Sequence, residues 1–294
     1  MKRVILVCET RGWAFESICK QIVKAYGDRY DCQIVDIDDI TRWGGEPQRC
    51  DVALHFWWKS AVRYQGIIRA KRVAVGVYDH WSIPQQPQQF QECVDVVNCF
   101  YVANEAIASD LALRAPGKPI YLTEDGVDLD LFTPQPFPAE FTVGWTGNGV
   151  YESLGMGDLK GIKLITEAAR RCNVPLVIQD KQAKQLRQDE MPEGFYSKIS
   201  CYVCASISEG TPVPSLESLA TGRLLVSTRV GLVPKLAADN PDAVIMVDRT
   251  VDAIVAGIQE ARAKPKSIAQ GPRTISRWDW KVKAKAFEPV LADG

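Results

Sequence analysis

Two glutamates, Glu209 and Glu217, enclose a segment whose composition suits the binding of an anion. The apolar run CYVCAS, the loop EGTPVP and the pattern SLESLA predict a strand, a loop and a helix that begins near Ser215. The first N–H groups of a helix lack internal partners and lie at the positive end of its dipole. Gly210 lets the backbone approach a ligand closely, and two prolines stiffen the loop. We expect an anion site here, although Glu217 alone would also stabilise a helix start and Glu209 would also suit a surface loop.

Short β-branched runs alternate with amphipathic stretches along the chain, which is the pattern of βαβ units around a parallel sheet. In the first half we expect strands at 3–8, 33–37, 52–56, 73–78, 97–102 and 120–123, and helices near 14–26, 60–70, 87–94 and 104–113. In the second half we expect strands near 141–146, 175–179, 201–206, 224–228 and 244–247, and helices near 160–172, 214–221, 232–238 and 250–263. Between the two sets lies TPQPFPAE at 133–140, whose prolines exclude a helix and indicate a linker.

This order predicts an α/β protein with two Rossmann-like domains that face a central cleft. The domains are 1–135 and 136–275, joined at about residue 136. The amphipathic tail at 276–294 is expected to be a helix with Trp278, Val282 and Phe287 in approximate helical spacing. Ligands of such sheets bind beyond the carboxyl ends of the strands, so the two domains would contribute two sets of loops to one site.

The composition is that of a globular protein and excludes several classes. Of 294 residues, 46% are hydrophobic and 24% are charged, and the net charge of −1 shows no overall preference for a polyanion. No apolar run reaches the ~20 residues of a membrane span, and we expect no secretory signal because the apolar run near Met1 is short. Nine scattered cysteines are typical of a reducing compartment, so we expect a cytoplasmic protein. With two histidines in all, and no second pair beside Cys201 and Cys204, we expect no metal site.

The frame from Glu209 to Glu217 closely resembles the E-x7-E motif of retaining GT-B glycosyltransferases of family 4, here in a compact form. Further resemblances follow in the expected order, namely RGWAFESICKQIV (11–23), EDGVDLDLFTP (124–134), VGWTGN (143–148), the Leu159-Lys160-Gly161 step and the terminal WDWKVKAKAFEPVL. The resemblance implies a GT-B fold, with an acceptor-binding first domain and a second domain that binds a nucleotide sugar. It also implies that the C-terminal helix at 276–294 crosses back onto the first domain.

For the donor, the resemblance implies a role for each residue of the loop. Glu209 would accept hydrogen bonds from hydroxyls of the donor sugar, with the backbone of Gly210 and Thr211 nearby. The amides of Ser215 and Leu216 would hold the diphosphate.

Glu217 would take the ribose diol, since a carboxylate offers two acceptor oxygens to adjacent hydroxyls. Lys160 would neutralise the charge that builds up on the leaving nucleoside diphosphate. Many relatives carry a second cation for the phosphate, where this chain has Asn148 instead. A neutral hydrogen bond from Asn148, or the charge of Lys163 or Arg11, would take that place.

In the first domain, VAVGVYDHWS (73–82) ends a predicted strand with Asp79 and His80 at the mouth of the cleft. Relatives place a histidine near this point beside the reacting sugar, and either residue fits that position. Gly12 belongs to the loop that resembles the family's glycine loop and is assigned to donor binding. His55, within an apolar run, is interpreted as structural. The expected catalytic residues are therefore Asp79, His80, Lys160 and Glu209.

The resemblance implies neither a protein nucleophile nor a metal, since the leaving phosphate itself helps to deprotonate the acceptor. The D-x-D matches at 36–38 and 128–130 are interpreted as strand-end and turn acids. No cofactor is expected beyond the nucleotide diphosphate sugar as co-substrate, with a UDP-linked hexose as the commonest case. The loop CETRGWAF lacks G-x-G-x-x-G, which disfavours a nicotinamide-dependent oxidoreductase. A non-catalytic nucleotide-sugar-binding protein stays open as an alternative.

The acceptor is expected to be a hydroxyl of a saccharide, a lipid or a small molecule. An alternative is a hydroxymethylated base in duplex DNA, because aromatic and cationic residues alternate between 56 and 72. Cations bind phosphates and an aromatic face supports a flipped base, but the same residues would also suit a core or a solvated helix face. The acceptor-binding candidates are Trp57, Trp58, Lys59, Arg63, Arg69 and Trp81, and Lys71 and Arg72 add to the positive charge.

Overall fold

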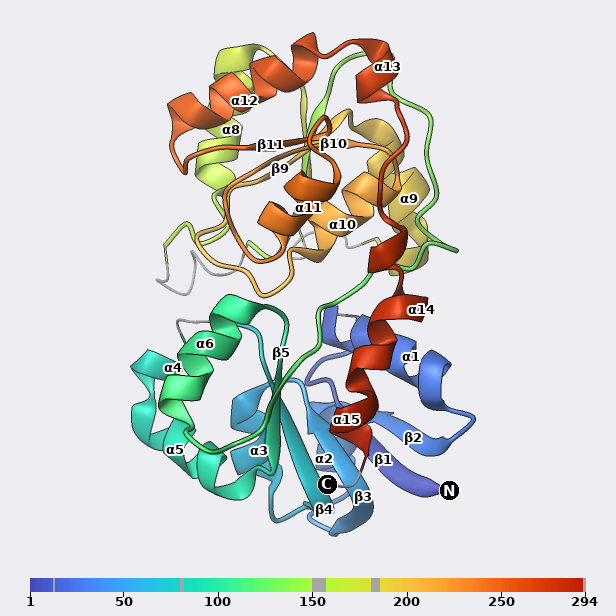
Figure 1. The fold of residues 1–294 in the computed structure, drawn as a ribbon, viewed down its shortest axis with the longest axis vertical. Coiled ribbons are helices and arrows are strands. Elements are labelled where there is room, and N and C mark those ends of the chain that lie inside the picture. The colour runs from blue at the N-terminus through green and yellow to red at the C-terminus, as the bar shows by residue number, and fades with distance from the viewer. Residues whose placement is uncertain (13, 80–81, 150–156, 181–185, 293–294) are drawn as a thin grey trace. The chain divides into compact units, whose positions relative to one another are not determined.

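The computed structural model describes residues 1–12, 14–79, 82–149, 157–180 and 186–292. The chain forms two compact units (Figure 1). Unit 1 consists of Met1–Asp125 with Trp280–Gly294, and unit 2 of Gly126–Asp279. Each unit contains its own parallel β-sheet and its own buried apolar core. The predicted linker at 133–140 lies inside unit 2.

The sheet of unit 1 has the strand order β2-β1-β3-β4-β5-β6, and all neighbouring strands are parallel. Each predicted strand of the first half is present. Its central strands are apolar on both faces, as a sheet covered on both sides requires. The strands are β1 (Lys2–Val7), β2 (Tyr30–Val35), β3 (Gln48–His55), β4 (Ile68–Val77), β5 (Cys99–Val102) and β6 (Ile120–Leu122).

Helices cover both faces of this sheet. One apolar cluster joins α1 and the C-terminal segment to the sheet, and others join α2, α3, α5 and α6 to it. The helix predicted at 60–70 ends at Tyr64, because residues from Ile68 onward pair with β3. The helices are α1 (Ala14–Tyr26), α2 (Ile37–Arg42), α3 (Trp58–Tyr64), α4 (Ser82–Gln85), α5 (Pro87–Val96) and α6 (Glu105–Arg114).

The C-terminal segment packs against α1 in unit 1 (Figure 1). It consists of short turns, α14 (Trp280–Lys283), η4 (Ala284–Phe287) and α15 (Glu288–Leu291), and not of the single helix predicted. Tyr26 donates its hydroxyl hydrogen bond to the carbonyl of Ala284 at 2.9 Å. The predicted apolar face is wrong, because Val282 is 48% exposed while Trp278 belongs to the core of unit 2.

Unit 2 has a second parallel sheet, with strand order β11-β10-β9-β7-β8, and each predicted strand is again present. The strands are β7 (Val143–Gly147), β8 (Leu176–Asp180), β9 (Cys201–Cys204), β10 (Leu224–Ser227) and β11 (Val244–Met246). The helices are α8 (Ile162–Cys172), α9 (Met191–Gly194), α10 (Val213–Ala220), α11 (Val233–Asp239), α12 (Val251–Ala263) and α13 (Lys266–Ala269). In both units, the loops that follow the strands meet at one edge of the sheet.

Candidate functional site

The loop from Glu209 to Pro212 leaves the carboxyl end of β9 and enters α10. The loop after β10 packs against it through Gly231, whose φ is +49°. A Cβ atom at Gly231 would lie 2.6 Å from the carbonyl oxygen of Gly210 and 2.9 Å from the ring of Pro212. Only glycine therefore fits this contact, which holds the loop in place. Sequence reasoning missed Gly231, and its position three residues after the predicted strand at 224–228 was the available signal.

Lys160 and Glu209 form an ion pair, with Lys160 Nζ 2.5 Å from Glu209 Oε1. The hydroxyl of Ser206 donates to the same carboxylate oxygen at 2.7 Å. The two side chains are only 24% and 16% exposed, so the pair is partly shielded from water. The structure thus brings together two predicted site residues from different loops, and it adds Ser206, which the sequence reasoning did not single out.

The Lys160 loop is tied directly to the start of the Glu209 loop. Gly161 has a φ of +74°, and a Cβ there would lie 2.3 Å from the carbonyl oxygen of Ala205. Arg249 donates to that same carbonyl at 2.8 Å and also to the carbonyl of Asp158. The ion pair therefore joins two loops whose backbones are already in close contact.

Glu217 lies on α10 with only 4% of its surface exposed. Its carboxylate accepts a hydrogen bond from the hydroxyl of Tyr196 at 2.6 Å and another from the side-chain amide of Gln188 at 2.5 Å. Burial, and then the charge of Glu217, raises the pKa of Tyr196. These two donors orient the Glu217 carboxylate on α10. Sequence reasoning did not identify Tyr196 or Gln188.

At the start of α10, the hydroxyls of Thr211 and Ser215 are buried without a hydrogen-bond partner. Such groups cost free energy when unpaired, so a rearrangement of the loop that brings them a polar partner is favoured. The helix begins at Val213, earlier than predicted, and the N–H of Ser215 already donates to the carbonyl of Pro212 at 2.7 Å. That bond engages the Ser215 amide, whose expected contact with the diphosphate stays a prediction, and Leu216 is fully buried within the helix.

Asn148 follows β7, and it lines a small pocket together with Lys160. It is 8% exposed. The next residue, Gly149, donates its N–H to Asp180 at 3.1 Å, and a Cβ there would lie 2.3 Å from the same carboxylate. Lys163 is exposed in the first turn of α8. The donor candidates of unit 2 are therefore placed on the loops after β7 and β9 and on α10.

In unit 1, the loops after the strands hold the remaining predicted residues. Asp79 follows β4 and accepts a hydrogen bond from the N–H of Ser82 at 2.7 Å, so it caps the start of α4. His80 and Trp81, two of the predicted site residues, lie outside the described residues. Gly12 has a φ of +76°, and its N–H donates to Glu16 at 2.7 Å.

Arg11 was one candidate for a phosphate-binding cation, and the structure assigns it another task. Its guanidinium lies 2.8 Å from Asp39, 3.3 Å from Glu16 and 3.5 Å from Asp36. Burial opposes ionisation of Asp39, but Arg11 and then Arg42 hold its pKa at about 2. Three carboxylates thus surround Arg11, which anchors the loop between β1 and α1.

His55 is structural, as predicted. It is 2% exposed, and its Nδ1 lies 2.9 Å from the hydroxyl of Ser60. That hydroxyl donates to the carbonyl of Trp57 at 2.7 Å, so Nδ1 carries the proton and donates to Ser60. Burial lowers the pKa of His55 to about 3.

In the aromatic and cationic segment at 56–72, some side chains lie in the core and others at the surface. Trp58 is 1% exposed, donates to the hydroxyl of Ser82 at 3.0 Å and packs against Phe90. Its expected role in acceptor binding is therefore wrong, because α3 turns it into the core. Trp57 stays half-buried at the carboxyl edge of the sheet, with Lys59 Nζ 5.0 Å from the centre of its ring. Arg63, on the last turn of α3, lies over Tyr64.

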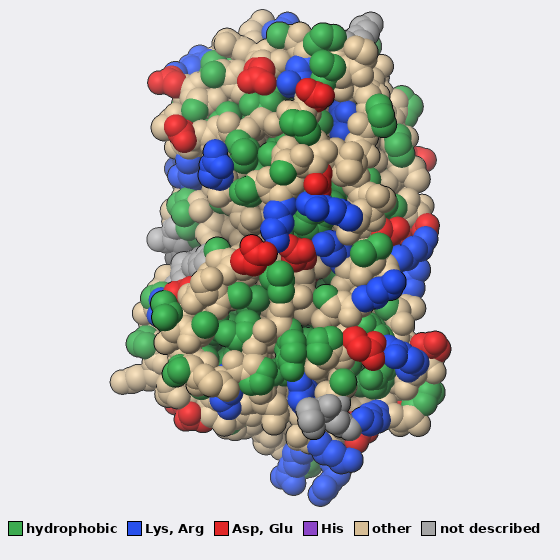
Figure 2. Space-filling model, in the orientation of Figure 1, with side chains coloured by type: hydrophobic (Ala, Val, Ile, Leu, Met, Phe, Trp, Pro, Cys, Tyr) green, Lys and Arg blue, Asp and Glu red, His purple; other side chains and the backbone are tan. Residues whose placement is uncertain are grey.

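The cations at 69–72 lie at the other edge of the sheet. Arg69 is the second residue of β4, whereas Asp79 follows its end, and the two ends of β4 are about 30 Å apart. Lys71 pairs with Asp51 at 2.8 Å, and Arg72 donates to the carbonyl of Val290. Lys and Arg side chains gather at this end of unit 1 (Figure 2). Arg69 therefore cannot share one bound acceptor group with Trp57.

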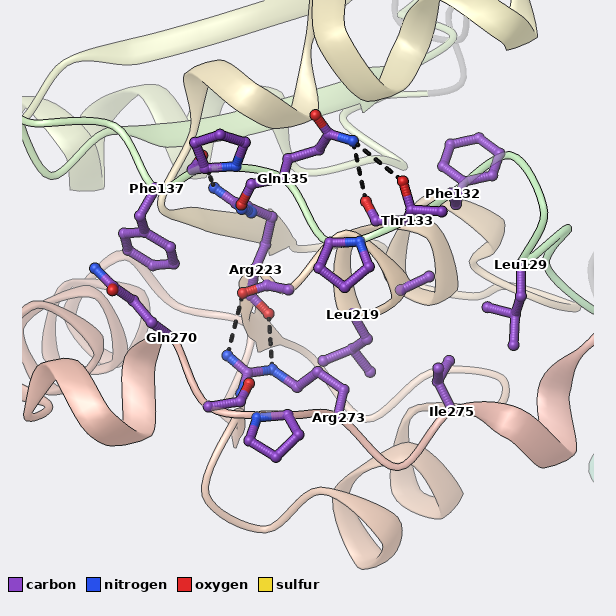
Figure 3. Close-up of a pocket in the computed structure, with 16 residues that line it drawn as sticks. Leu129, Phe132, Thr133, Gln135, Phe137, Leu219, Arg223, Gln270, Arg273 and Ile275 are labelled. Carbon is purple, nitrogen blue, oxygen red and sulfur yellow. Dashed lines mark hydrogen bonds between the residues drawn. The ribbon is translucent and has the colours of Figure 1, made fainter.

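A cavity of about 450 Å³ lies at the starting edge of the unit 2 sheet (Figure 3). Two arginines, Arg223 and Arg273, line it. Every N–H of both guanidinium groups donates to a backbone carbonyl. Burial, and then the charge of Arg273, lowers the pKa of Arg223 to about 10. These arginines therefore hold chain segments together and offer no donor to a ligand.

Two kinds of feature are absent from the residues that the structure describes. No helix among them is long and apolar enough to cross a membrane. No group of three or more His, Cys, Asp or Glu side chains in that part of the chain could hold a metal ion. Cys201 and Cys204 lie buried in β9 as free thiols.

Comparisons with known proteins place this geometry in a wider context. The model of the family described as "Glycosyl transferases group 1" matches residues 176–270, which include the Glu209–Glu217 segment. No curated protein sequence matches the chain significantly.

Solved structures are similar over nearly the whole chain. HepE from Anabaena, crystallised with UDP and glucose, matches with a TM-score of 0.76 and 12% identity over 99% of both chains. Sucrose-phosphate synthase from Thermosynechococcus elongatus matches with a TM-score of 0.72 and 12% identity over 99% of this chain and 98% of its own. A glycosyltransferase from Rickettsia africae matches with a TM-score of 0.66 and 12% identity over 99% of both chains. The chain therefore has the predicted GT-B fold.

Proposed function

We propose that this protein is a retaining glycosyltransferase of the family 4 type that moves a hexose from UDP to an acceptor hydroxyl. The observation that carries the proposal is the ion pair between Lys160 and Glu209, next to the unpartnered hydroxyls of Thr211 and Ser215. A cation, a carboxylate and buried hydroxyls on adjoining loops are the groups that a sugar diphosphate needs. The match of 176–270 to the group 1 model, and the UDP and glucose bound to Anabaena HepE, support the same donor class.

Each group has a distinct task in this proposal. Glu217, oriented by Tyr196, accepts hydrogen bonds from the ribose hydroxyls. The hydroxyls of Thr211 and Ser215 donate to the diphosphate, which satisfies two otherwise unpaired buried groups. As the diphosphate binds, the ammonium of Lys160 turns toward it, and Glu209 accepts hydrogen bonds from the sugar.

The reaction then needs no protein nucleophile. The bond between the anomeric carbon and the diphosphate oxygen breaks while the acceptor oxygen bonds to that carbon on the same face. The proton of the acceptor hydroxyl passes to the departing phosphate, so charge is balanced. Lys160 stabilises the developing phosphate charge more strongly than it stabilises the intact donor, which lowers the barrier. Because Lys160 supplies this positive charge, we propose that the reaction needs no metal ion and no cofactor. The proposed compartment is the cytoplasm.

For the acceptor, we favour a saccharide or small-molecule hydroxyl over a base in DNA. The DNA hypothesis depended on Trp57, Lys59 and the cations at 69–72 acting as one surface. Arg69 lies at the opposite end of β4 from the carboxyl-edge loops, and Trp58 is in the core. Lys71 and Arg72 are engaged with Asp51 and the C-terminal segment.

The test combines purified protein with UDP-glucose and related UDP- and GDP-sugars. Acceptors are a panel of saccharides, polyols, lipids and hydroxymethylcytosine-containing DNA, with products weighed by mass spectrometry. We expect transfer of the sugar to an acceptor. The new glycosidic linkage should have the same anomeric configuration as the donor, which NMR coupling constants measure. Inverted linkage would contradict the retaining mechanism. Donor binding without either transfer or hydrolysis would favour the non-catalytic alternative.

A further inference from the structure

Glu9 has an unusual backbone conformation for its residue type. It follows β1 and has a φ of 65°. Among the described residues, the other non-glycine residue with a positive φ is Asn173, which closes α8 in a position where asparagine is common. A glutamate in the left-handed region costs free energy, and such strain concentrates at functional sites.

Neighbouring strands and α2 hold Glu9 in this conformation. The N–H of Cys8 donates to the carbonyl of Val35 at 2.9 Å, and the N–H of Thr10 donates to Cys8 at 2.8 Å. The carbonyl of Glu9 accepts a hydrogen bond from Ile37, the first residue of α2, at 3.0 Å. Since β1 lies between β2 and β3, these bonds place Glu9 at the carboxyl edge of the sheet, where ligands bind.

The side chain of Glu9 is half-buried and makes no hydrogen bond or ion pair with any described residue. Burial raises its pKa to about 7, and the charge of Lys59 on α3 acts in the opposite direction. The other carboxylates near this loop are Glu16 on α1 and Asp36 and Asp39 around the start of α2, and all three face Arg11. Asp79, after β4, caps α4. Glu9 is thus a shielded carboxylate whose neighbours are engaged elsewhere.

We propose that the carboxylate of Glu9 accepts a hydrogen bond from the acceptor hydroxyls, beside Lys59 and Trp57, and selects a neutral saccharide or polyol. Glu9 follows β1 and Lys59 follows β3, and these strands are neighbours in the sheet. A polyol offers hydroxyl donors to Glu9 and oxygen acceptors to the Lys59 ammonium, and the half-buried ring of Trp57 provides an apolar surface for a sugar. An ionised Glu9 repels an anionic group placed directly beside it. The inference rests on the proposed glycosyl transfer and names its acceptor class.

The test compares Glu9→Gln, which keeps the size and removes the charge, with Glu92→Gln, an exposed control on α5. The probes are UDP-glucose as donor, with methyl glucosides, maltose and inositol as acceptors, from pH 5.5 to 8.5. We expect Glu9→Gln to raise the acceptor KM at least tenfold, to change kcat and the UDP affinity less than threefold, and to remove the dependence of acceptor KM on pH around 7. An unchanged acceptor KM and pH profile in Glu9→Gln would overturn the inference.

Glu9→Gly separates a binding role from a structural one. Glycine tolerates a φ of 65°, so this variant should melt at or above the wild-type temperature while its acceptor KM rises as in Glu9→Gln. A destabilised Glu9→Gly protein with unchanged acceptor KM would indicate a structural residue only. Transfer to lipid or DNA alone, or to none of these saccharides and polyols, would overturn the acceptor class. Failure to bind UDP-glucose would overturn the proposed function itself.

Discussion

The ammonium of Lys160 lies 2.5 Å from a carboxylate oxygen of Glu209, so two side chains that the E-x7-E resemblance assigns to different parts of a donor are partners of each other. The pair is only partly exposed, and two loops in close backbone contact hold it. In the proposed function, donor binding requires an exchange of partners, in which Lys160 binds the phosphate and Glu209 accepts hydrogen bonds from the sugar hydroxyls. This exchange links recognition of both halves of the donor.

Lys160→Ala and Glu209→Gln should each lower kcat about 10²- to 10³-fold, the usual effect of removing a group that stabilises charge in the transition state. The double variant should lose much less than the product of the single losses, because each change leaves the other partner unpaired. Initial rates with UDP-glucose measure this. Lys198→Ala and Glu193→Gln, both exposed in unit 2, are matched controls and should stay within twofold of wild type.

Glu217→Ala should act mainly on donor affinity, with the Kd for UDP raised about tenfold or more and a smaller effect on kcat at saturating donor. Tyr196→Phe should raise the same Kd less, because the carboxylate stays in place and loses one orienting hydrogen bond of 2.6 Å. Calorimetric titration with UDP measures both. If Glu217→Ala bound UDP as wild type does, the assignment of the ribose contact would fail.

Gly231→Ala should destabilise the protein by about 1–3 kcal/mol and reduce donor binding, because the new methyl group meets the carbonyl of Gly210 at a positive φ. Denaturant unfolding and UDP titration check the two effects. Gly66→Ala is the control, since no atom lies within 4 Å of a Cβ at that position and its φ is not positive. Equal stability of the two variants would mean that the loop contact is not needed.

His55 should make unit 1 sensitive to acid. The unfolded chain binds a proton at its ordinary pKa of 6.5, whereas the folded protein resists protonation until about pH 3. The contribution of neutral His55 to the free energy of unfolding is therefore fully present above pH 6.5. It declines as the pH falls toward 3, by at most about 1.4 kcal/mol per pH unit. His55→Gln should show a shallower fall in unfolding free energy across this window. An identical slope in both proteins would assign the acid sensitivity to other groups.

Arg69→Ala combined with Lys71→Ala should leave transfer to saccharide acceptors within twofold of wild type, because both residues lie at the starting edge of β4. Rates at low and high salt with each acceptor provide the measurement. A selective loss of transfer to hydroxymethylated DNA, with donor hydrolysis preserved, would restore the DNA hypothesis.

Local sequence patterns were sufficient for the element order, the parallel sheets and the loop between Glu209 and Glu217. Hydrophobic periodicity and turn residues act over a few positions, so each strand and the exact extent of α1 could be predicted from neighbouring residues. Tertiary structure alone determined which distant groups meet. Lys160 and Glu209 pair because β7 and β9 are neighbours, and Trp57 and Trp58 differ in burial because α3 turns one ring into the core. Strand order and burial depend on the whole chain, and so the positive φ and the half-buried carboxylate of Glu9 gave no signal in the sequence.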